Sequence, residues 1–401
     1  MKSGKHPLLA VLKPLLAIAV LAVVFNMLSW TDTATYQAGG EDVTVEGEIE
    51  GDWKTDAVEF RVTDEAGESV MLLELERGAA AMTMDGTQLG DEAQWEAGML
   101  TVFASVELRW VALAMGLFFV ALLFGVTRWW RLLRLVGCHS SWFNVMRLTY
   151  LGLFFNLVMP GLTGGDVAKA VLVVRENPER RAWALMSVIV DRVLGLATLA
   201  LLALVVVLIS GETFAELRLP MLGFLALGVG GAFAYFNKGL RRALRIDVLA
   251  KKLPMADKLR NLDEAARTYF SHPVELGMAV LYSLGNHTGA IVAVWALGNS
   301  FGVTAEDVGL LDYFALVPIA NIVSSIPIMP GGWGVGEAAY IYLFTLIGAT
   351  ASLGVAVSVS FRLCQVLLSL LGGLFLLAPG ARAELDDLEE LELDAGAPPT
   401  P

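Results

Sequence analysis

Long apolar stretches recur along the whole chain and are separated by shorter polar ones. A helix needs about 20 apolar residues to cross roughly 30 Å of hydrocarbon. Stretches close to this length lie near residues 8–28, 106–126, 183–209, 219–236, 274–297 and 354–378. The pattern predicts six membrane-spanning helices, and therefore an all-α polytopic membrane protein.

Two further apolar stretches, 142–159 and 309–329, each end at a Met-Pro-Gly sequence. Proline and glycine weaken or break a helix, and a bilayer core has no water to satisfy the backbone groups that are set free. After the second break the chain continues as Gly-Gly-Trp-Gly-Val-Gly-Glu. We predict that residues 142–177 and 309–350 form re-entrant helical hairpins, which enter the membrane, turn at the break and return.

Charged residues indicate which side each loop faces. Arginines and lysines flank the first hairpin on both sides, and residues 237–272 carry nine bases, so these segments are predicted to be cytoplasmic. Residues 299–308 and 330–353 contain no lysine or arginine and are predicted to face outside. The two hairpins would then enter from opposite faces, with both termini in the cytoplasm and a multi-pass location in the cytoplasmic membrane.

Composition adds an acidic module and an acidic tail. With 56% hydrophobic and 17% charged residues, the chain is too apolar for a soluble globule. Its net charge of −13 is concentrated in residues 30–107, with 19 acids against three bases, and in the tail 384–394, with seven acids. Period-two apolar patches (Val43, Val45; Val58, Phe60, Val62; Val70, Leu72) predict a small antiparallel β-rich insertion outside the membrane.

The predicted domains follow from these boundaries. They are an N-terminal transmembrane helix at 1–29, an extracytoplasmic acidic β-rich module at 30–105, a transmembrane domain at 106–378 and an acidic cytoplasmic tail at 379–401. Within the transmembrane domain, one repeat covers about 106–236 and a second about 274–378. The many acids of the module suggest a solvated face or, alternatively, a site for a cation or for an envelope partner.

The repeats are suggested by paired motifs. Met159-Pro160-Gly161 and Met329-Pro330-Gly331 are as many residues apart in the sequence as Arg192 and Arg362 are. Asp166 and Glu337 follow the respective glycines, and their offset is larger by a single position. Since the charge pattern gives the two copies opposite orientations, the sequence predicts an inverted repeat with broken helices, which is typical of transporters with a site near the bilayer midplane.

Charged side chains at bilayer depth need a partner or a polar cavity. The planar guanidinium of arginine suits phosphate, so Arg192 and Arg362 are candidates for binding an anionic head group. The other interpretation is that they only pair with Asp166, Asp191 or Glu337 and lock the hairpins. His287 could carry a proton or make an interhelical hydrogen bond. Trp129-Trp130 is interpreted as an interfacial anchor or, alternatively, as a contact for a lipid chain or sugar.

The motifs NLVMPGLTGGDVAKA with the later Asp191-Arg192, and PIMPGGWGVGEAA with the later Phe361-Arg362, resemble a known family. It is the flippase-like family that comprises the transmembrane region of lysylphosphatidylglycerol synthases and related stand-alone membrane proteins. The resemblance covers roughly 106–378 and implies a domain that translocates lipids such as aminoacylated phospholipids or polyprenyl-phosphate-linked sugars. Because only a short tail follows the last predicted helix, we expect the chain to lack the synthase domain and to have no enzymatic activity.

The resemblance, with the motifs, gives the candidate substrate-binding residues. They are Pro160, Gly161, Gly164, Gly165, Asp166, Lys169, Asp191, Arg192, Pro330, Gly331, Gly332, Gly334, Glu337 and Arg362. Lys169 stands where the family usually has a basic residue, whereas Gly336 stands where members often carry a basic or polar one. The module at 30–105 is longer than the loop that the family would lead one to expect there.

Three functions remain open at this point. The first is a flippase for an anionic phospholipid or a polyprenyl-phosphate-linked lipid. The second is a proton-coupled transporter of a soluble anion, which would use Asp166, Glu337 or His287, and the third is a non-transporting envelope scaffold. No cofactor, metal site, disulfide or nucleic-acid partner is predicted, since Cys138 and Cys364 have no ligand spacing and no nucleotide-binding loop occurs.

Overall fold

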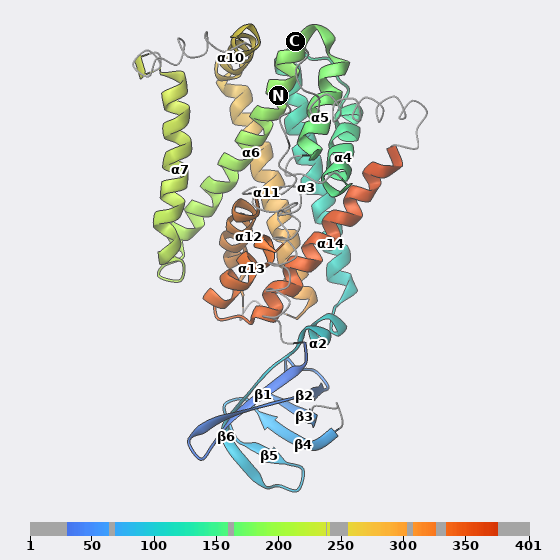
Figure 1. Cartoon of the computed structure of the whole chain (residues 1–401), viewed down its shortest axis with the longest axis vertical. Coiled ribbons are helices and arrows are strands. Elements are labelled where there is room, and N and C mark those ends of the chain that lie inside the picture. Colours follow the sequence, from blue (N-terminus) through green and yellow to red (C-terminus); the bar gives the residue numbers. More distant parts are fainter. Residues whose placement is uncertain are drawn as a thin grey trace, which may run out of the picture.

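The computed structural model describes residues 30–63, 69–158, 164–237, 239–240, 256–302, 308–325 and 334–375. It has a bundle of helices with a small β-barrel at one end (Figure 1). The predicted N-terminal helix at 8–28 and the acidic tail lie outside the described residues.

Within these described residues, five helices are long and apolar enough to cross a membrane. They are α3 (Leu108–Leu135), α6 (Arg181–Ile209), α7 (Ala215–Phe236), α11 (Pro273–Ser300) and α14 (Ala351–Phe375). They coincide with five of the six predicted spans. The first of these five, α3, continues well past the predicted end at 126, and this extension carries Arg128 into the bundle.

Four shorter helices form two antiparallel pairs. Helix α4 (Trp142–Val158) packs on α5 (Gly164–Glu176), and α12 (Leu310–Ser325) packs on α13 (Val335–Leu346). With 12 to 17 residues each, none reaches the length of about 20 that spans a bilayer. The α4–α5 pair lies at the end of the bundle away from the barrel, whereas α12 and α13 lie nearer the barrel (Figure 1).

Helix lengths follow the same order twice along the chain. Helices α3, α4, α5 and α6 run long, short, short, long, and α11, α12, α13 and α14 do the same. The corresponding first residues are 165, 168, 171 and 170 positions apart, close to the spacing of the Met-Pro-Gly motifs.

Each short pair packs against the long helix of the other set. Gly372 of α14 lies so close to α4 that an added Cβ would be 2.1 Å from the carbonyl oxygen of Tyr150. In the corresponding place, Ile322 of α12 packs on Leu199 and Ala200 of α6. The two sets of helices are therefore interlocked rather than side by side.

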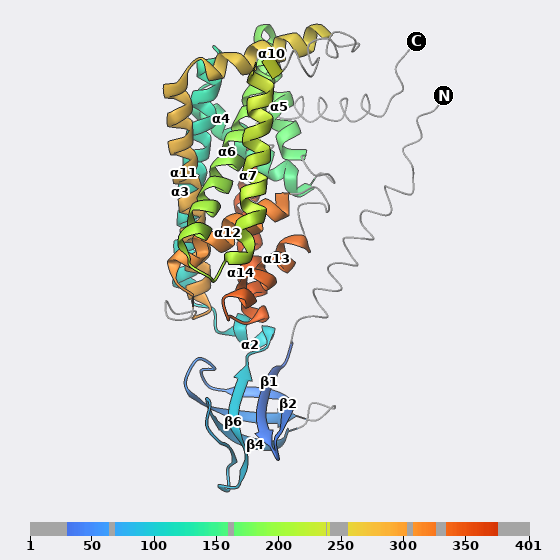
Figure 2. The ribbon, with the colours of Figure 1, turned by 90° about the vertical axis from the view of Figure 1, so that its left-hand side faces the viewer.

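Two helices lie at the margin of the bundle. The apolar helix α7 stands beside α6 at one edge (Figure 1) and exposes large side chains such as Leu219 and Leu227. Helix α10 (Ala256–Phe270) lies across the end of the bundle (Figure 2). The hydroxyl of Tyr269 donates to the carbonyl of Leu132 at 3.2 Å, which ties α10 to α3.

The β-rich module is a closed antiparallel barrel of six strands in sequence order. The strands are β1 (Asp32–Ala38), β2 (Glu41–Glu50), β3 (Ala57–Thr63), β4 (Ser69–Glu76), β5 (Ala81–Thr83) and β6 (Gln88–Glu96). The inner face is made of apolar side chains such as Phe60 and Leu73, as the alternation predicts. In β4, however, the predicted phase is wrong: Leu73 and Leu75 point inward, and Val70 is exposed.

A buried carboxylate joins the barrel to the helices. Asp32, at the start of β1, is 3% exposed. Its carboxylate accepts hydrogen bonds from Ile49 N at 2.7 Å, from Gly98 N at 2.7 Å and from Thr101 Oγ1 at 2.9 Å. Gly98 and Thr101 belong to the first turn of α2 (Met99–Ala104), which leads into α3, so one side chain links β1, β2 and the entry to the membrane domain.

We expect Asp32→Ala to loosen this junction. The change leaves three donors without an acceptor, and buried unsatisfied donors cost about 1–3 kcal/mol each. Limited proteolysis of the purified protein should show faster cleavage between the barrel and α3 than in the wild type. Asp42→Asn, which changes an exposed acid of β2, is the matched control, and equal cleavage of the two variants would contradict the role of Asp32.

Candidate functional site

Asp166 and Arg192 form an ion pair between α5 and α6. Asp166 is the third residue of α5, where a carboxylate is stabilised by the helix N-terminus. Its Oδ2 lies 3.5 Å from Arg192 Nη1. Helix α5 is positioned by close packing on α4, because Gly165 N donates to Asn156 Oδ1 at 2.7 Å and an added Cβ at Gly165 would be 2.0 Å from Gly152 O.

Glu337 and Arg362 form the corresponding pair between α13 and α14. Glu337 is also the third residue of its helix, and its carboxylate accepts from Arg362 Nε. It also accepts from Gly334 N at 2.6 Å, which caps the helix. Gly334 has a φ of +80°, a conformation that glycine adopts without strain. An added Cβ at Gly336 would be 2.4 Å from Arg362 Nη2, so glycine at this position makes room for the guanidinium.

The two pairs occupy equivalent positions but different surroundings. Each arginine is the twelfth residue of its helix, counting from Arg181 in α6 and from Ala351 in α14. The side chain of Arg192 is 61% exposed and that of Asp166 28%. The values for Arg362 and Glu337 are 11% and 3%. The first pair is therefore accessible from outside the bundle, and the second is enclosed.

Asp191 pairs with Arg128, which follows the predicted span at 106–126. Arg128 Nε lies 2.7 Å from Asp191 Oδ1, and Arg128 Nη1 donates to Ser283 Oγ at 2.7 Å. This buried group joins α3, α6 and α11. No local pattern pointed to it, because Arg128 and Asp191 are 63 residues apart and Arg128 follows a span predicted to end at 126. The adjacent Arg131 is instead partly exposed and paired with Glu275.

Lys169 and Trp129 are also in contact at this end of the bundle. The Nζ atom of Lys169 lies 4.2 Å from the centre of the Trp129 ring, a cation–π distance. Trp129 is 1% exposed and its Nε1 donates to Ser187 Oγ at 3.1 Å, so its interpretation as an interfacial anchor is wrong. His287 makes an interhelical hydrogen bond, from Nε2 to Gly195 O at 2.9 Å, as one of the two interpretations expected.

A cavity of about 430 Å³ is lined by both the Asp166–Arg192 and the Arg128–Asp191 pairs, together with Lys169 and His287. Its charged lining residues are Arg128, Asp166, Lys169, Asp191 and Arg192, and its neutral polar ones include Thr149, Asn156, Asn286, His287 and Asn321. The lining side chains come from α3, α4, α5, α6, α11 and α12. The cavity thus brings together four of the predicted site residues with groups from the second set of helices.

Other predicted site residues lie elsewhere. Glu337 and Arg362 do not line this cavity. Gly164 and Gly165 begin α5, and Gly334 precedes α13. Pro160, Gly161, Pro330, Gly331 and Gly332 lie outside the described residues.

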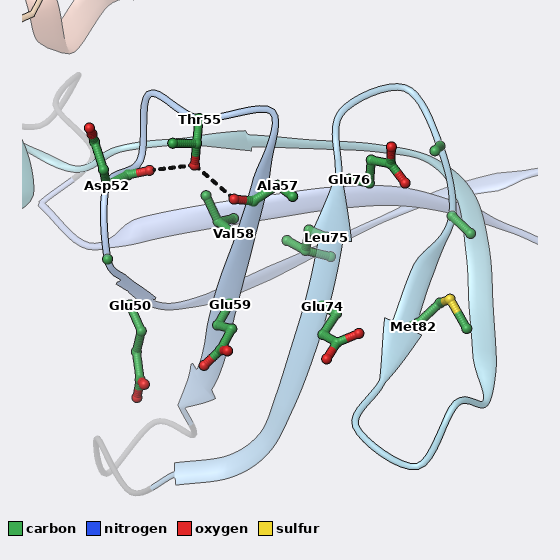
Figure 3. Close-up of a pocket in the computed structure, with 13 residues that line it drawn as sticks. Glu50, Asp52, Thr55, Ala57, Val58, Glu59, Glu74, Leu75, Glu76 and Met82 are labelled. Atoms are coloured by element: carbon green, nitrogen blue, oxygen red, sulfur yellow. Dashed lines mark hydrogen bonds between the residues drawn. The ribbon is translucent and has the colours of Figure 1, made fainter.

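The barrel carries a separate groove of about 790 Å³. Figure 3 shows its labelled carboxylates Glu50, Asp52, Glu59, Glu74 and Glu76 around the apolar side chains of Val58, Leu75 and Met82. Among them, Glu50 is paired with Arg61. The groove is strongly acidic, and its lining comes from β2, β3, β4, β5 and the loops beside them.

Comparison with known proteins gives the family. The family described as lysylphosphatidylglycerol synthase TM region matches residues 96–373, more than half of the chain. The chain belongs to this family.

Membrane proteins of three organisms are similar to the chain over most of their own length. A UPF0104 membrane protein of Pyrococcus horikoshii is 24% identical over 311 residues, which cover 71% of this chain and 92% of the relative. Those of Methanocaldococcus jannaschii and Methanothermobacter thermautotrophicus are 23% and 22% identical, and the alignments cover 76% and 79% of their lengths and 60% and 64% of this chain. No solved structure matches the chain.

The burial of the Arg128–Asp191 pair leads to a stability prediction. Arg128→Met leaves the Asp191 carboxylate buried without its partner, and breaking a buried pair in this way costs about 3–5 kcal/mol. Replacing both residues, Arg128→Met with Asp191→Leu, should restore much of that loss because no lone charge remains.

Thermal unfolding of the purified variants in detergent measures these differences in stability. The matched control is Arg131→Met on the same helix, which removes a pair that is about one third exposed and is expected to cost about 1 kcal/mol or less. Equal destabilisation by Arg128→Met and Arg131→Met would show that burial of the Asp191 pair has no energetic consequence.

Proposed function

We propose that the helical domain moves an anionic lipid, a phospholipid or a polyprenyl-phosphate-linked lipid, across the cytoplasmic membrane, without catalysing a chemical reaction. The observation that carries this proposal is the exposure of Arg192. It lies near the middle of the apolar helix α6, between Ile189 and Val193, which are 44% and 59% exposed. A charged cavity wall is thus continuous with an apolar outer surface.

Such an arrangement suits a molecule with a charged head and apolar chains. A guanidinium at bilayer depth costs at least about 2.5 kcal/mol unless it has a partner or water. Arg192 has Asp166 beside it and the cavity behind it. A phosphate head group could replace the carboxylate of Asp166, because arginine binds both oxyanions with the same planar fork. The chains of the lipid would remain along Ile189 and Val193.

We infer that the domain is an inverted repeat with re-entrant hairpins. The support is the repeated helix order, the equivalent positions of the two ion pairs and the location of the short helix pairs toward opposite ends of the bundle. In such proteins, alternating access moves one repeat against the other around a fixed site. Arg192 and Arg362 would then contact the head group at different stages, and Asp166 and Glu337 would hold each arginine when no phosphate is bound.

The other candidate functions are less well supported. A transporter of soluble anions needs a water-filled path, whereas the exposed flank of Arg192 is apolar. A scaffold without transport activity gives no reason for a cavity lined by five charged residues. The barrel at residues 30–105 remains a candidate site for an envelope partner, with its acidic groove as the surface available to a basic one.

Orientation of the domain is open to a direct test. We expect Glu179→Cys, in the exposed turn before α6, to react with a membrane-impermeant maleimide only from the cytoplasmic side, and Thr87→Cys of the barrel only from the opposite side. The native cysteines Cys138 and Cys364 are buried, and burial raises the pKa of the Cys138 thiol, so little of the reactive thiolate forms there at neutral pH.

Labelling of intact and opened cells, with the wild type as background, measures this topology. Reaction of Glu179→Cys only from outside would overturn the orientation, and reaction of both variants from one side would overturn the arrangement of barrel and hairpins.

The arginines give the functional test. We expect Arg192→Gln to leave the protein folded, since exposed ion pairs contribute about 0–1 kcal/mol to stability, but to weaken head-group binding by about 2–5 kcal/mol. Arg192→Lys should restore binding only in part because lysine lacks the fork. Arg362→Gln should also destabilise the protein, by about 3–5 kcal/mol, because it strands the buried carboxylate of Glu337; adding Glu337→Gln should recover stability without recovering transport.

Lipid binding and the rate of transbilayer movement in reconstituted liposomes are the measurements. If Arg192→Gln and the Glu337→Gln/Arg362→Gln variant both bind and move anionic lipid as the wild type does, the arginines are structural and the proposed route is excluded.

A further inference from the structure

Helices α3 and α11 end in the same way. Each contains 28 residues, and their first residues are 165 positions apart. A glycine follows each helix by two residues, Gly137 with a φ of +72° and Gly302 with a φ of +76°. Glycine in this left-handed conformation is a common way to end a helix. Since Gly137 and Gly302 are also 165 positions apart, they are equivalent positions, and each lies along the chain between a long helix and the short pair that follows it.

A cationic side chain lies on each glycine. At the end of α3, an added Cβ on Gly137 would be 3.1 Å from Arg180 Cζ, and Arg180 Nη1 donates to the carbonyl of Val136 at 3.0 Å. At the end of α11, an added Cβ on Gly302 would overlap the Lys54 side chain, with Nζ as its nearest atom. The last carbonyls of a helix carry a partial negative charge, which a cation beside them stabilises. Each helix end thus has a base beside it.

The two bases come from different parts of the chain. Arg180 is the residue before α6, so it belongs to the first set of helices. The corresponding residue before α14 is Thr350, and residues 330–353 contain no lysine or arginine. This shortage of bases is what predicts an extracytoplasmic location for the segment. The base at the end of α11 comes instead from the barrel, since Lys54 lies in the turn between β2 and β3.

The segment that joins the barrel to α3 also contacts the end of α11. Glu107 N, just before α3, donates to the carbonyl of Ser300 at 2.8 Å and so satisfies one of the carbonyls that a helix end leaves free. The rings of Phe103 in α2 and Phe301 pack edge to face, with their centres 5.6 Å apart. Because Asp32 also ties the start of α2 to the barrel, the end of α11 is held from the barrel side by several connected contacts.

The last turn of α11 also receives the short helix α12. An added Cβ on Gly298 would overlap the hydroxyl of Tyr313, so this tyrosine of α12 lies directly on the backbone of α11. Tyr313 is fully buried, and its ring packs edge to face on Phe344 of α13, with the centres 5.9 Å apart. The α12–α13 pair is therefore packed on the same turn of α11 that the barrel contacts.

We propose that the barrel positions the α12–α13 pair and, with it, the enclosed Glu337–Arg362 pair. Lys54 supplies to α11 the cation that Arg180 supplies to α3, and a fixed last turn of α11 holds Tyr313 in place. Movement of α12 and α13 away from α11 has to break this chain of contacts. In this role the barrel completes the second set of helices structurally. The role concerns the conformation of the domain and does not depend on which ligand the domain carries.

Hydrogen exchange of the full chain in detergent tests the contact at Lys54. Lys54→Met keeps an unbranched side chain and removes the charge, so the amides in the last turn of α11 should exchange about twofold to fivefold faster. Lys54→Arg keeps a cation and should exchange as the wild type does. Arg180→Met should have the matching effect at the end of α3 and none at the end of α11.

The matched control is a second base of the barrel. Arg77 is exposed and lies over the Trp95 ring, 4.7 Å from its centre. Arg77→Met removes the same charge from the barrel as Lys54→Met does and should leave exchange in α11 unchanged. Thermal unfolding of each variant verifies that it is folded before its exchange is measured.

Cysteine labelling tests whether the contact at Lys54 positions the α12–α13 pair. Ser324, in the last turn of α12, lies beside the enclosed pair, because an added Cβ on Gly336 would be 2.9 Å from Ser324 Oγ and would overlap Arg362 Nη2. In Lys54→Met, Ser324→Cys should react about twofold to fivefold faster with a membrane-impermeant thiol reagent added from the barrel side, because the pair separates from α11 more often. Arg77→Met should leave this rate unchanged. The native cysteines are buried, and the chain without Ser324→Cys gives the background.

The outcomes separate this inference from the proposed function. Faster exchange and faster labelling in Lys54→Met, but not in Arg77→Met, are the expected results. Unchanged exchange at the end of α11, or faster exchange with unchanged labelling, would overturn the positioning role and leave anionic lipid transport intact. Equal effects of Lys54→Met and Arg77→Met would also overturn it, because the charge of the barrel rather than the contact would then be responsible. Absence of lipid movement in liposomes would overturn the transport proposal alone.

Discussion

Two carboxylate–arginine pairs, Asp166–Arg192 and Glu337–Arg362, govern how the helical domain can be built. An arginine in the middle of an apolar helix requires an acceptor at the same depth, and a short helix supplies it. A carboxylate at the third residue of α5 or α13 is stabilised by the helix N-terminus. To place that end inside the bundle, the chain must stop its preceding helix early, which accounts for helices of 12 to 17 residues among spans of 22 to 29.

The two pairs differ in exposure, and this difference makes the two sides of the domain unlike. Residues of the same kinds occupy equivalent positions in the two pairs. The pair that contains Arg192 is exposed, whereas the pair that contains Arg362 is enclosed. If the two sets of helices are an inverted repeat, as we propose, the opposite state would enclose the first pair and expose the second. The Arg128–Asp191 pair has no equivalent in the second set of helices. The positions there that correspond to Arg128 and Asp191, at the offset that separates Arg192 from Arg362, are Gly298 and Phe361. This buried pair fixes α6 against α3 and α11 next to Arg192.

Much of this architecture is predictable from the sequence. The length of the apolar stretches locates five of the described spans, and the alternation along the strands predicts the β-module. Both patterns can be found in the sequence because they involve residues that are close together in the chain. One of the two interpretations of the arginines, that they pair with Asp166, Asp191 or Glu337, includes both ion pairs that the structure contains. The partner of Asp191 was missed, since a pair between groups so far apart in the chain depends on how α3 and α6 pack. The phase of β4 was missed for a related reason: Val70 is apolar but lies where the barrel leaves it exposed. Asn156, Asn286 and Asn321 also carry no local signal, because they line one cavity only when α4, α11 and α12 meet.

We propose that the cavity beside Arg192 holds the head of a lipid whose chains lie against α6. An experimental structure of the protein in nanodiscs of anionic phospholipid tests it most directly. We expect density for a phosphate within hydrogen-bonding distance of Arg192 or Lys169, with acyl chains leaving past Ile189 and Val193. A cavity that contains only water, with every lipid chain outside it and the Asp166–Arg192 pair intact, would contradict it.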